Sequence, residues 1–424
     1  MRRLPRGGPL EWGARPLITS PAQGTAARGA SPWRTMPSVL RLATALLLAA
    51  AGIFFFALPP LVAGRLNRVE TRAVHEVSDR ARRLHASLRI ADLHDDLLLW
   101  DRDPLRRSTR GHSDVPRLEE GNVAVQLFST VTEVPRGYNY DANAGGMDLV
   151  TPLAIASRWP ASSWNSRLAR ALHQGDKLRR AAAESEGRLV LATSRAELAA
   201  ALEARARQPA GRRVVVAVLA TEGLHALEGR LETLDALFEA GFRSAGLAHF
   251  ADNAAAGSAH GARRGGLTPL GRDALRRMEE RRMIVDLAHA SPRAFDEALA
   301  QARRPVMVSH TGVSAVCPGP RNLADGQLRR LARNGALVGI GYWDGAVCDR
   351  SPRAIARSIR HAVKVAGVRH VALGSDWDGA TTVPFDASRL EVLTQALLDE
   401  GLSEDAIRAV MGENALRFLL ANLP

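Results

Sequence analysis

The chain has few cysteines, few lysines and few aromatic residues. Its 424 residues include two cysteines and two lysines, and only 5% are Phe, Trp or Tyr. A zinc finger needs several Cys or His ligands at close, regular spacing, and neither Cys317 nor Cys348 has such neighbours. The sequence therefore excludes a cysteine-based zinc finger.

Positive charge is plentiful but is concentrated near the N-terminus. Of the net +13, residues 1–89 supply +10, from fourteen Arg against four acidic residues, so residues 90–424 carry only +3. Nucleic-acid binding depends on a basic surface of the folded part. We therefore expect no nucleic-acid partner.

One apolar run stands out. Residues 42–64, "LATALLLAAAGIFFFALPPLVAG", contain no charge and are long enough to span a bilayer. Seven Arg and one Glu precede the run, which places the N-terminus in the cytoplasm and the following chain outside the membrane. The run is interpreted as a transmembrane anchor or as a cleaved signal peptide, for which the small residues of "LVAG" are a cleavage cue.

The segments on either side of this run differ in character. Residues 1–41 are basic, rich in Pro and Gly and without periodicity, so we expect them to be disordered. Met36 is an alternative translation start. Residues 65–88 have an amphipathic pattern, which predicts a linker helix between the membrane and a folded domain over 89–424.

Eight short apolar runs alternate with helical patterns in the folded domain. They are residues 89–96, 122–129, 213–223, 244–250, 283–291, 304–312, 336–343 and 370–379. The alternation predicts an α/β fold with parallel strands, either a (β/α)8 TIM barrel or a doubly wound sheet. A polar residue near the carboxyl end of nearly every strand favours the barrel, because barrel active sites form there. The long interval 130–212 is expected to elaborate the rim.

Ionisable side chains end six of the predicted strands. His94 and Asp96 are two residues apart at the end of the first strand, so both side chains point to the same side. The other five are Glu222, His249, His289, His310 and Asp376. Each alone has a structural interpretation, as a hydrogen-bonded His or a helix-capping Asp. Together they predict a site for divalent metal ions, whose usual ligands are imidazole and carboxylate.

Such a site has an evident chemistry. Two carboxylate-bridged ions would share a water that ionises near neutral pH and attacks a carbonyl. Asp376 is placed to protonate the departing amine. Arg321, eleven residues after His310, is a candidate for binding a substrate carboxylate through two parallel hydrogen bonds.

These motifs, in this order, resemble the membrane (renal-type) dipeptidases, peptidase family M19 of the amidohydrolase superfamily. The likeness covers roughly residues 88–420. It rests on "DLHDD", "SDVPRLEEGNVAVQLFS", "ATEGLHAL", "LAHFADN", "GGLTPLGRDALRRMEERRMIVDLAHAS", "PVMVSHTGVSAVCPGPRNL", "HVALGSDWDG" and "MGENALRFL".

The resemblance implies a binuclear zinc site. His94 and Asp96 match the ligands of one ion, and His289 and His310 match those of the other. Glu222 matches the carboxylate that bridges the two ions.

The resemblance also assigns residues to the substrate. His249 matches the His that binds substrate and stabilises the tetrahedral intermediate, and Arg321 matches the Arg that holds the terminal carboxylate. Asp376 matches the acid/base, with Asp378 as a close alternative. Tyr342 is expected in the wall of the substrate pocket.

Two further expectations follow from the family. Cys317 and Cys348 resemble positions that pair in eukaryotic relatives, so a disulfide is expected. The family's anchors are often C-terminal lipid anchors, whereas this chain has its apolar run at the N-terminus, as suits a bacterial inner-membrane protein with a periplasmic or extracellular catalytic domain.

We therefore expect a zinc-dependent dipeptidase that tolerates a C-terminal D-residue and acts outside the cytoplasmic membrane. One alternative is a specialised amide hydrolase that tailors a secreted peptide product. Another is a catalytically silent, membrane-tethered binding barrel. The sequence leaves open whether the protein forms a homodimer.

Overall fold

The computed structural model describes residues 36–70, 75–209 and 213–424. Residues 1–35, most of the segment expected to be disordered, lie outside this part. The chain divides into two compact units, Met1–Ala51 and Gly52–Pro424. The larger unit contains all the strands of the described residues.

The predicted apolar run is helical. Helix α2 (Ser38–Gly52) is followed by the π-helical turn η1 (Ile53–Ala57) and by α3 (Leu58–Leu66). Pro59 and Pro60 lie in the first turn of α3, directly after the π-helical turn, so their missing N–H groups remove hydrogen bonds to that turn. The carbonyl oxygen of Phe55 in that turn accepts a hydrogen bond from Arg158 instead. Within the described residues, one helical segment, Ser38–Leu66, is both long enough and apolar enough to cross a membrane, judged by length and composition alone.

The segment expected to be a single linker helix over 65–88 has a different structure. Helix α3 ends at Leu66, and β1 (Arg68–Val69) then pairs in parallel with β11 (Thr382–Val383). Helix α4 (Asp79–Ala86) begins after Ser78, whose side chain accepts a hydrogen bond from the backbone N–H of Ala81. The strand pairing and the new N-cap divide the segment. Residues 71–74 lie outside the described part.

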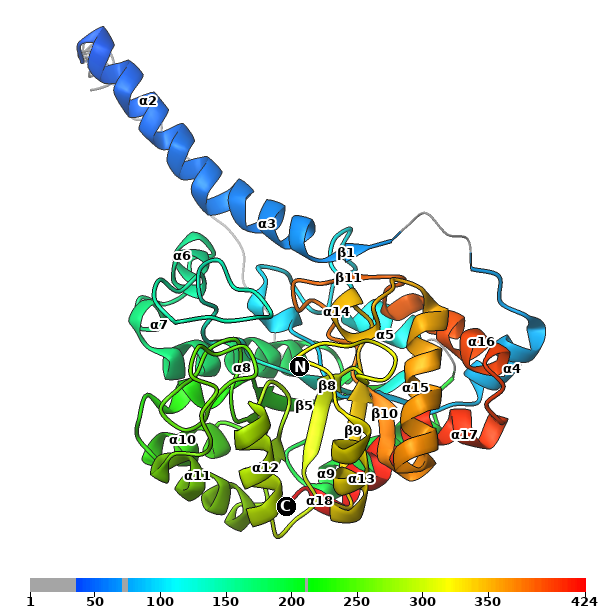
Figure 1. The fold of residues 1–424 in the computed structure, drawn as a ribbon. Coiled ribbons are helices and arrows are strands. Elements are labelled where there is room, and N and C mark those ends of the chain that lie inside the picture. Colours follow the sequence, from blue (N-terminus) through cyan, green and yellow to red (C-terminus); the bar gives the residue numbers. More distant parts are fainter. Residues whose placement is uncertain (1–35, 71–74, 210–212) are drawn as a thin grey trace, which may run out of the picture. The chain divides into compact units, whose positions relative to one another are not determined.

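Eight parallel strands close a barrel, which confirms the predicted fold (Figure 1). In order around the barrel they are β2 (Ile90–Asp92), β3 (Val123–Phe128), β5 (Val215–Thr221), β6 (Phe242–Gly246), β7 (Ile284–Asp286), β8 (Met307–Thr311), β9 (Leu337–Ile340) and β10 (Val371–Leu373). Pairing of β10 with β2 and of β3 with β5 completes the ring. Every residue of these strands is buried, as expected where helices cover the outer face of a parallel sheet.

Helices surround the barrel, and several of them begin in the same way. Thr268, Ser291 and Ser351 are N-caps, and each is followed by Pro at the first helical position. Each cap side chain accepts a hydrogen bond from the backbone three residues on, which satisfies one of the free N–H groups of the helix. The helices after β5 are α10 (Glu232–Glu239), α11 (Pro269–Glu280), α12 (Pro292–Gln301), α13 (Asp325–Asn334), α14 (Asp344–Val347), α15 (Pro352–Ala366), α16 (Glu391–Asp399), α17 (Glu404–Arg408) and α18 (Asn414–Asn422).

The long interval after β3 contains rim structure, as predicted, and one strand that the sequence pattern did not reveal. Helix α5 (Val115–Glu120) precedes β3. The helices and the strand between β3 and β5 are α6 (Val150–Ala156), α7 (Ser162–Asn165), α8 (Arg167–Glu184), β4 (Leu189–Leu191) and α9 (Arg195–Ala206). Strand β4 pairs with the first half of β5, whereas β6 pairs with the second half. With three residues, β4 is too short to show a clear period in the sequence.

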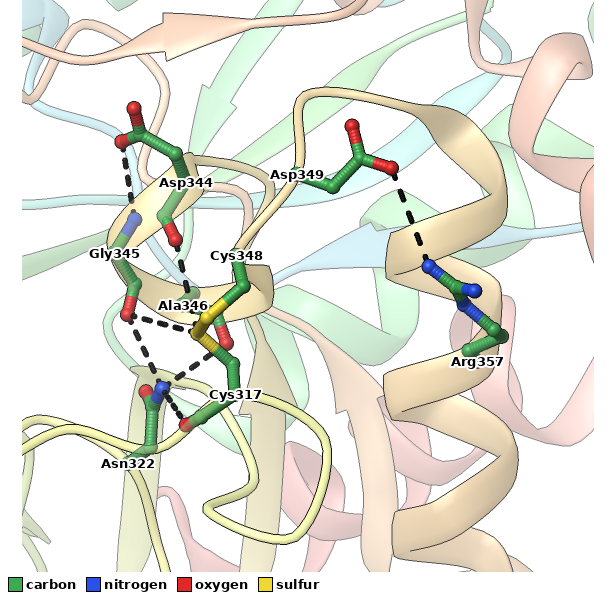
Figure 2. Close-up of a disulfide and its surroundings, with 8 residues drawn as sticks. All are labelled: Cys317, Asn322, Asp344, Gly345, Ala346, Cys348, Asp349 and Arg357. Carbon is green, nitrogen blue, oxygen red and sulfur yellow. Dashed lines mark hydrogen bonds and ion pairs between the residues drawn. A yellow bond between two sulfur atoms is a disulfide. The ribbon is translucent and has the colours of Figure 1, made fainter.

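A disulfide joins two loops at the carboxyl end of the barrel (Figure 2). Cys317, in the loop after β8, is bonded to Cys348, which follows α14, across a Cα–Cα distance of 5.3 Å. Asn322 reinforces this connection, because its Nδ2 donates to the carbonyl oxygens of Cys317, Gly345 and Ala346. The expected pairing of the two cysteines is confirmed.

Removing this disulfide should lower stability markedly. The bond closes a loop with a sequence separation of 31 residues, and the chain-entropy estimate for a loop of that length is about 3 to 4 kcal/mol. We expect C317S/C348S to unfold at a lower denaturant concentration than the wild type. A reductant that does not chelate metal should lower the wild-type midpoint equally and leave the variant unchanged. Equal midpoints for the two proteins without reductant would contradict the prediction.

Candidate metal centre and active site

The seven ionisable residues predicted from the strand ends lie together at the carboxyl end of the barrel. His94 and Asp96 follow β2, Glu222 follows β5, and His310 lies within β8. His249, His289 and Asp376 lie in the loops that follow β6, β7 and β10. All seven are buried, and Asp376 is the most exposed of them at 8%. Parallel strands place their carboxyl ends on one side of the barrel, so residues distant in sequence meet there.

The Glu222 carboxylate is at the centre of this cluster. Its Oε1 lies 3.0 Å from Nε2 of His289, 3.3 Å from Nε2 of His310 and 3.5 Å from Nε2 of His94. Its Oε2 lies 3.1 Å from Nε2 of His249. Four imidazoles from four different strand ends therefore face one carboxylate.

Asp96 and Asp376 flank the cluster on the side of His94. Nε2 of His94 lies 3.5 Å from Oδ1 of Asp96 and 4.0 Å from Oδ1 of Asp376. Both His289 (φ 59°) and Asp376 (φ 61°) adopt the left-handed backbone region, which is unfavourable for residues other than glycine. Backbone strain of this kind, on the order of 1 kcal/mol or more per residue, concentrates at functional sites.

Burial and mutual contact shift the protonation of these groups. Burial raises the pKa of the Glu222 carboxyl well above its usual range, and the nearby Asp96 raises it further. Burial lowers the pKa of His249, His289 and His310 well below the usual imidazole range. Those three rings are therefore neutral, which is the form of His that binds a metal.

His94 behaves differently from the other three histidines. Burial lowers its pKa, but the facing Asp96 and Glu222 more than offset that effect and raise the pKa to about 10. Without a metal ion, His94 is the cation that partly balances the carboxylates.

The donor set fits divalent cations. Among the described residues, Nε2 of His94, Oδ1 of Asp96 and Nδ1 of His289 are buried without a hydrogen-bond partner. Nε2 of His289 and Nε2 of His310 face each other at 3.0 Å. Three groups of residues each offer ligand atoms that lie within 4.8 Å of one another inside the group. The groups are His94–Glu222–His310, Glu222–His249–His289 and His94–Asp96–Asp376. Buried imidazole and carboxylate atoms that face one another without protein partners are what a metal site provides.

The structure separates the two carboxylates proposed for acid/base catalysis. Burial raises the pKa of Asp376 to about 8; His94 opposes this rise and Asp96 adds to it. Asp378 instead forms an ion pair with Arg102 and accepts hydrogen bonds from the backbone N–H groups of His112 and Ser113. Burial opposes ionisation of Asp378, but Arg102 outweighs it and lowers the pKa of that carboxyl. Asp378 is thus occupied in a structural network, and only Asp376 lies beside the cluster.

Arg321 lies next to the cluster and is also buried, with 5% of its surface exposed. One guanidinium nitrogen donates to the carbonyl oxygen of His310 at 2.6 Å, and the guanidinium carbon lies 5.8 Å from the Trp343 ring centre. Burial lowers the pKa of Arg321, while Asp376 and Glu222 oppose that change. Its Nε has no partner among the described residues, so the guanidinium retains a donor for an anionic ligand.

Tyr342 does not join the site. Its side chain is fully buried in the core, where its ring packs against those of Trp377 and Phe385. The following residue, Trp343, occupies the position expected of Tyr342, with its ring centre 5.9 Å from that of His310. Adjacent residues of an extended chain point to opposite sides. An error of one residue in the expected position therefore replaces the side chain that faces the site with one that faces the core.

Sequence reasoning missed two aromatic residues of the site. The Tyr140 hydroxyl accepts a hydrogen bond from Nε1 of Trp343 at 2.9 Å. Burial raises the pKa of Tyr140 to about 12, and Asp376 adds to this shift. The Phe250 ring centre lies 4.9 Å from that of His249 and 5.4 Å from that of His289. One feature of the sequence could have indicated Tyr140. Two of the three tyrosines in the chain, Tyr138 and Tyr140, fall in the same loop at the carboxyl end of the barrel.

A TIM barrel that gathers imidazoles and carboxylates at the carboxyl ends of its strands defines the class of metal-dependent barrel hydrolases. Comparison with known proteins narrows this class. The sequence model of "Membrane dipeptidase (Peptidase family M19)" matches residues 78–422. The chain belongs to this family.

Individual relatives agree with this assignment. An uncharacterized dipeptidase of Schizosaccharomyces pombe is 28% identical over 317 residues, which is 72% of each chain. The dipeptidase aclJ of Aspergillus oryzae is 36% identical over 215 residues, covering 48% of this chain and 51% of that one.

Solved structures support the fold. A metallopeptidase from Rhodobacter sphaeroides, determined with a phosphinate mimic of the dipeptide L-Ala-D-Ala, superimposes with a TM-score of 0.64 at 23% identity, over 80% of this chain and 99% of that one. The probable dipeptidase PvdM from Pseudomonas aeruginosa superimposes with a TM-score of 0.67 at 16% identity, over 81% of this chain and 97% of that one.

Metal removal should make stability fall as pH rises above 7. In the metal-free fold, Asp376 has a pKa of about 8 and His94 of about 10, against about 3.9 and 6.5 in the unfolded chain. The folded state then holds more protons than the unfolded state, so stability decreases through this window. The lowered pKa values of the other three histidines act only below pH 7. We expect the chelator-treated protein to lose a few kcal/mol between pH 7 and pH 9.

Thermal unfolding at the two pH values measures this effect, with the metal-loaded protein as control. Bound cations keep Asp376 ionised and His94 neutral throughout, so the loaded protein should change much less. An equal change in both forms would contradict the assignment of these groups to the metal centre.

Proposed function

We propose that the protein is a zinc-dependent dipeptidase that holds two zinc ions and hydrolyses the peptide bond of dipeptides. The observation that carries the proposal is the Glu222 carboxylate facing four imidazoles, with Arg321 beside them in the same buried site. Membership of the membrane dipeptidase family supports it. His94 and Asp96 would hold one ion, His289 and His310 the other, and Glu222 would bridge both.

When bound, the two ions would supply an activated water and polarise the scissile carbonyl. The chain's own residues position and protonate the substrate. Arg321 would bind the terminal carboxylate, which fixes the C-terminal residue. Asp376 would take a proton from the attacking water and pass it to the departing amine.

His249 would bind the substrate where negative charge develops on the carbonyl oxygen. Its Nδ1 lies 3.1 Å from the carbonyl oxygen of Glu133, the geometry of a hydrogen bond donated by that ring nitrogen. Burial lowers the pKa of His249, so the ring is neutral before the reaction. A proton taken up at Nε2 as negative charge develops on the carbonyl oxygen would let the ring donate a hydrogen bond to that oxygen.

We further propose that the substrate's C-terminal residue can have the D configuration. Support comes from the Rhodobacter sphaeroides metallopeptidase, whose structure was determined with a phosphinate mimic of L-Ala-D-Ala. A peptide bond between L-Ala and D-Ala is therefore the first substrate to test.

We also propose that the apolar helix stays attached and anchors the enzyme in the inner membrane, with the barrel outside the cytoplasm. Ala63, within the "LVAG" sequence considered as a cleavage cue, is 3% exposed and belongs to an apolar cluster with Leu99 and Trp100. Cleavage within "LVAG" would remove this packing and expose the apolar side chains beneath it.

Hydrolysis of small dipeptides tests the proposed function. We expect the zinc-loaded full chain to release free amino acids from L-Ala-L-Ala and L-Ala-D-Ala, and chelation to abolish the release. Asp376→Asn should keep both zinc ions, as metal analysis would show, but lower turnover about 10²- to 10⁴-fold, the usual contribution of proton transfer. Absence of release by a protein shown to hold two zinc ions would overturn the dipeptidase proposal.

Arg321→Ala should raise KM more than it lowers kcat. Loss of a hydrogen bond to a charged group corresponds to about 1.5 to 3 kcal/mol, or an increase in KM of about 10- to 150-fold. The matched substrate is the same dipeptide with its C-terminus blocked as an amide. Because that substrate has no carboxylate, wild type and variant should hydrolyse it similarly. A similar loss on both substrates would assign Arg321 another role.

A further inference from the structure

An apolar cavity of about 290 Å³ adjoins the metal centre. We call it the apolar chamber and define it by Phe54, Leu58, Val62, Trp100, Val150 and Leu153. Asp96 and His249, two residues of the predicted metal centre, also line it. The chamber is therefore continuous with the candidate active site.

One wall of the chamber comes from the apolar N-terminal helix. Phe54, Leu58 and Val62 belong to η1 and α3, which are part of the same compact unit as the barrel. This wall is held in place at several points. Arg158 donates a hydrogen bond to the carbonyl oxygen of Phe55 and lies 4.8 Å from the ring centre of Phe56.

The opposite wall combines the rim between β3 and β5 with the loop after β2. Val150 and Leu153 belong to α6, and Trp100 follows the turn after β2. Nε1 of Trp100 donates to the carbonyl oxygen of Asp378 at 2.6 Å, so its polar atom is satisfied and its ring is free to face the chamber. A pocket with apolar walls and a few polar groups at one end is typical of a ligand site.

The orientation of a bound substrate follows from Arg321. Arg321 does not line the chamber, and its neighbours are His310 and Trp343. If the substrate carboxylate lies on Arg321, the C-terminal residue occupies that side of the metal centre. The acyl side of the scissile bond then points toward Asp96, His249 and the chamber.

We propose that the apolar chamber binds a large apolar group on the acyl side of the scissile amide. This inference rests on the proposed function and specifies its substrate class. The group is either the side chain of an N-terminal residue such as Leu or Phe, or a medium-length acyl chain on a single amino acid. The chamber is at the small end of the usual range for ligand pockets, so it accommodates one such group.

Kinetics on paired substrates test the proposal with the zinc-loaded full chain in detergent. The first pair is Phe-Gly and Ala-Gly, and the second is N-octanoyl-glycine and N-acetyl-glycine. Burial of a large apolar side chain predicts a preference of about 10- to 100-fold in kcat/KM for the larger member. A preference in the first pair identifies a side chain as the occupant, and a preference in the second identifies an acyl chain.

Two neighbouring residues of α3 provide a matched pair of variants. Val62 lines the chamber, whereas Leu61 is 66% exposed. Val62→Trp should fill the chamber and reduce the preference for the larger substrate at least about fivefold, a conservative share of the burial effect. Leu61→Trp adds a similar side chain outside the chamber and should leave both rates unchanged. Leu153→Phe fills the chamber from the opposite wall and replaces Val62→Trp if that variant does not fold.

The outcomes separate this inference from the proposed function. Hydrolysis of Ala-Gly without preference in either pair would overturn the inference and leave the dipeptidase proposal standing. A preference that survives Val62→Trp and Leu153→Phe in folded, zinc-loaded protein would place the apolar subsite elsewhere and also overturn it. No hydrolysis of any of the four substrates would overturn the inference alone if L-Ala-L-Ala or L-Ala-D-Ala is still hydrolysed, and would overturn both proposals if those two dipeptides also remain intact.

Discussion

The contact between one buried carboxylate and four imidazoles governs this structure. Glu222 is 5% exposed, and its two oxygens face Nε2 of four histidines at 3.0 to 3.5 Å. An ionised carboxylate in such a position is costly unless cations compensate it. The eight-strand barrel supplies the geometry, because its closed parallel sheet brings the ends of β2, β5, β6, β7 and β8 together at one end. The barrel places the carboxylate among the imidazoles, and this contact determines both their protonation and their suitability as metal ligands.

Much of this arrangement could be predicted from the sequence. Each barrel strand is a short apolar run, and six of the eight end near an ionisable residue that has no reason to be buried on its own. The spacing of the apolar runs predicted the strands, and the position of His94, Asp96 and Glu222 at the ends of those runs predicted that they meet. Both predictions were possible because a strand end is defined by local sequence. The H-x-D spacing added a direction, since residues two apart in a strand share a side.

The features that could not be predicted depend on contacts distant in sequence. The division of residues 65–88 arises when β1 pairs with β11, more than 300 residues away. The exchange of Tyr342 for Trp343 depends on where β9 ends, which apolar periodicity does not fix to one residue. The role of Asp378 depends on Arg102 and His112, neither of which belongs to a recognisable motif. The apolar chamber combines helix α3 with a rim that the sequence marks only as a long interval.

If the apolar helix anchors the protein as proposed, its position in one wall of the chamber would couple membrane attachment to substrate specificity. Val62 faces the chamber, while Ala63 packs against the rim. A protease that cut the chain between α3 and α4 would leave the helix behind and release a barrel whose chamber had lost one side. The freed enzyme would keep its metal ligands and Arg321 but would meet its substrates through a wider, wetter opening. Shedding from the membrane and a change in substrate range would then be a single event, so the soluble and tethered forms would be two different catalysts made from one gene.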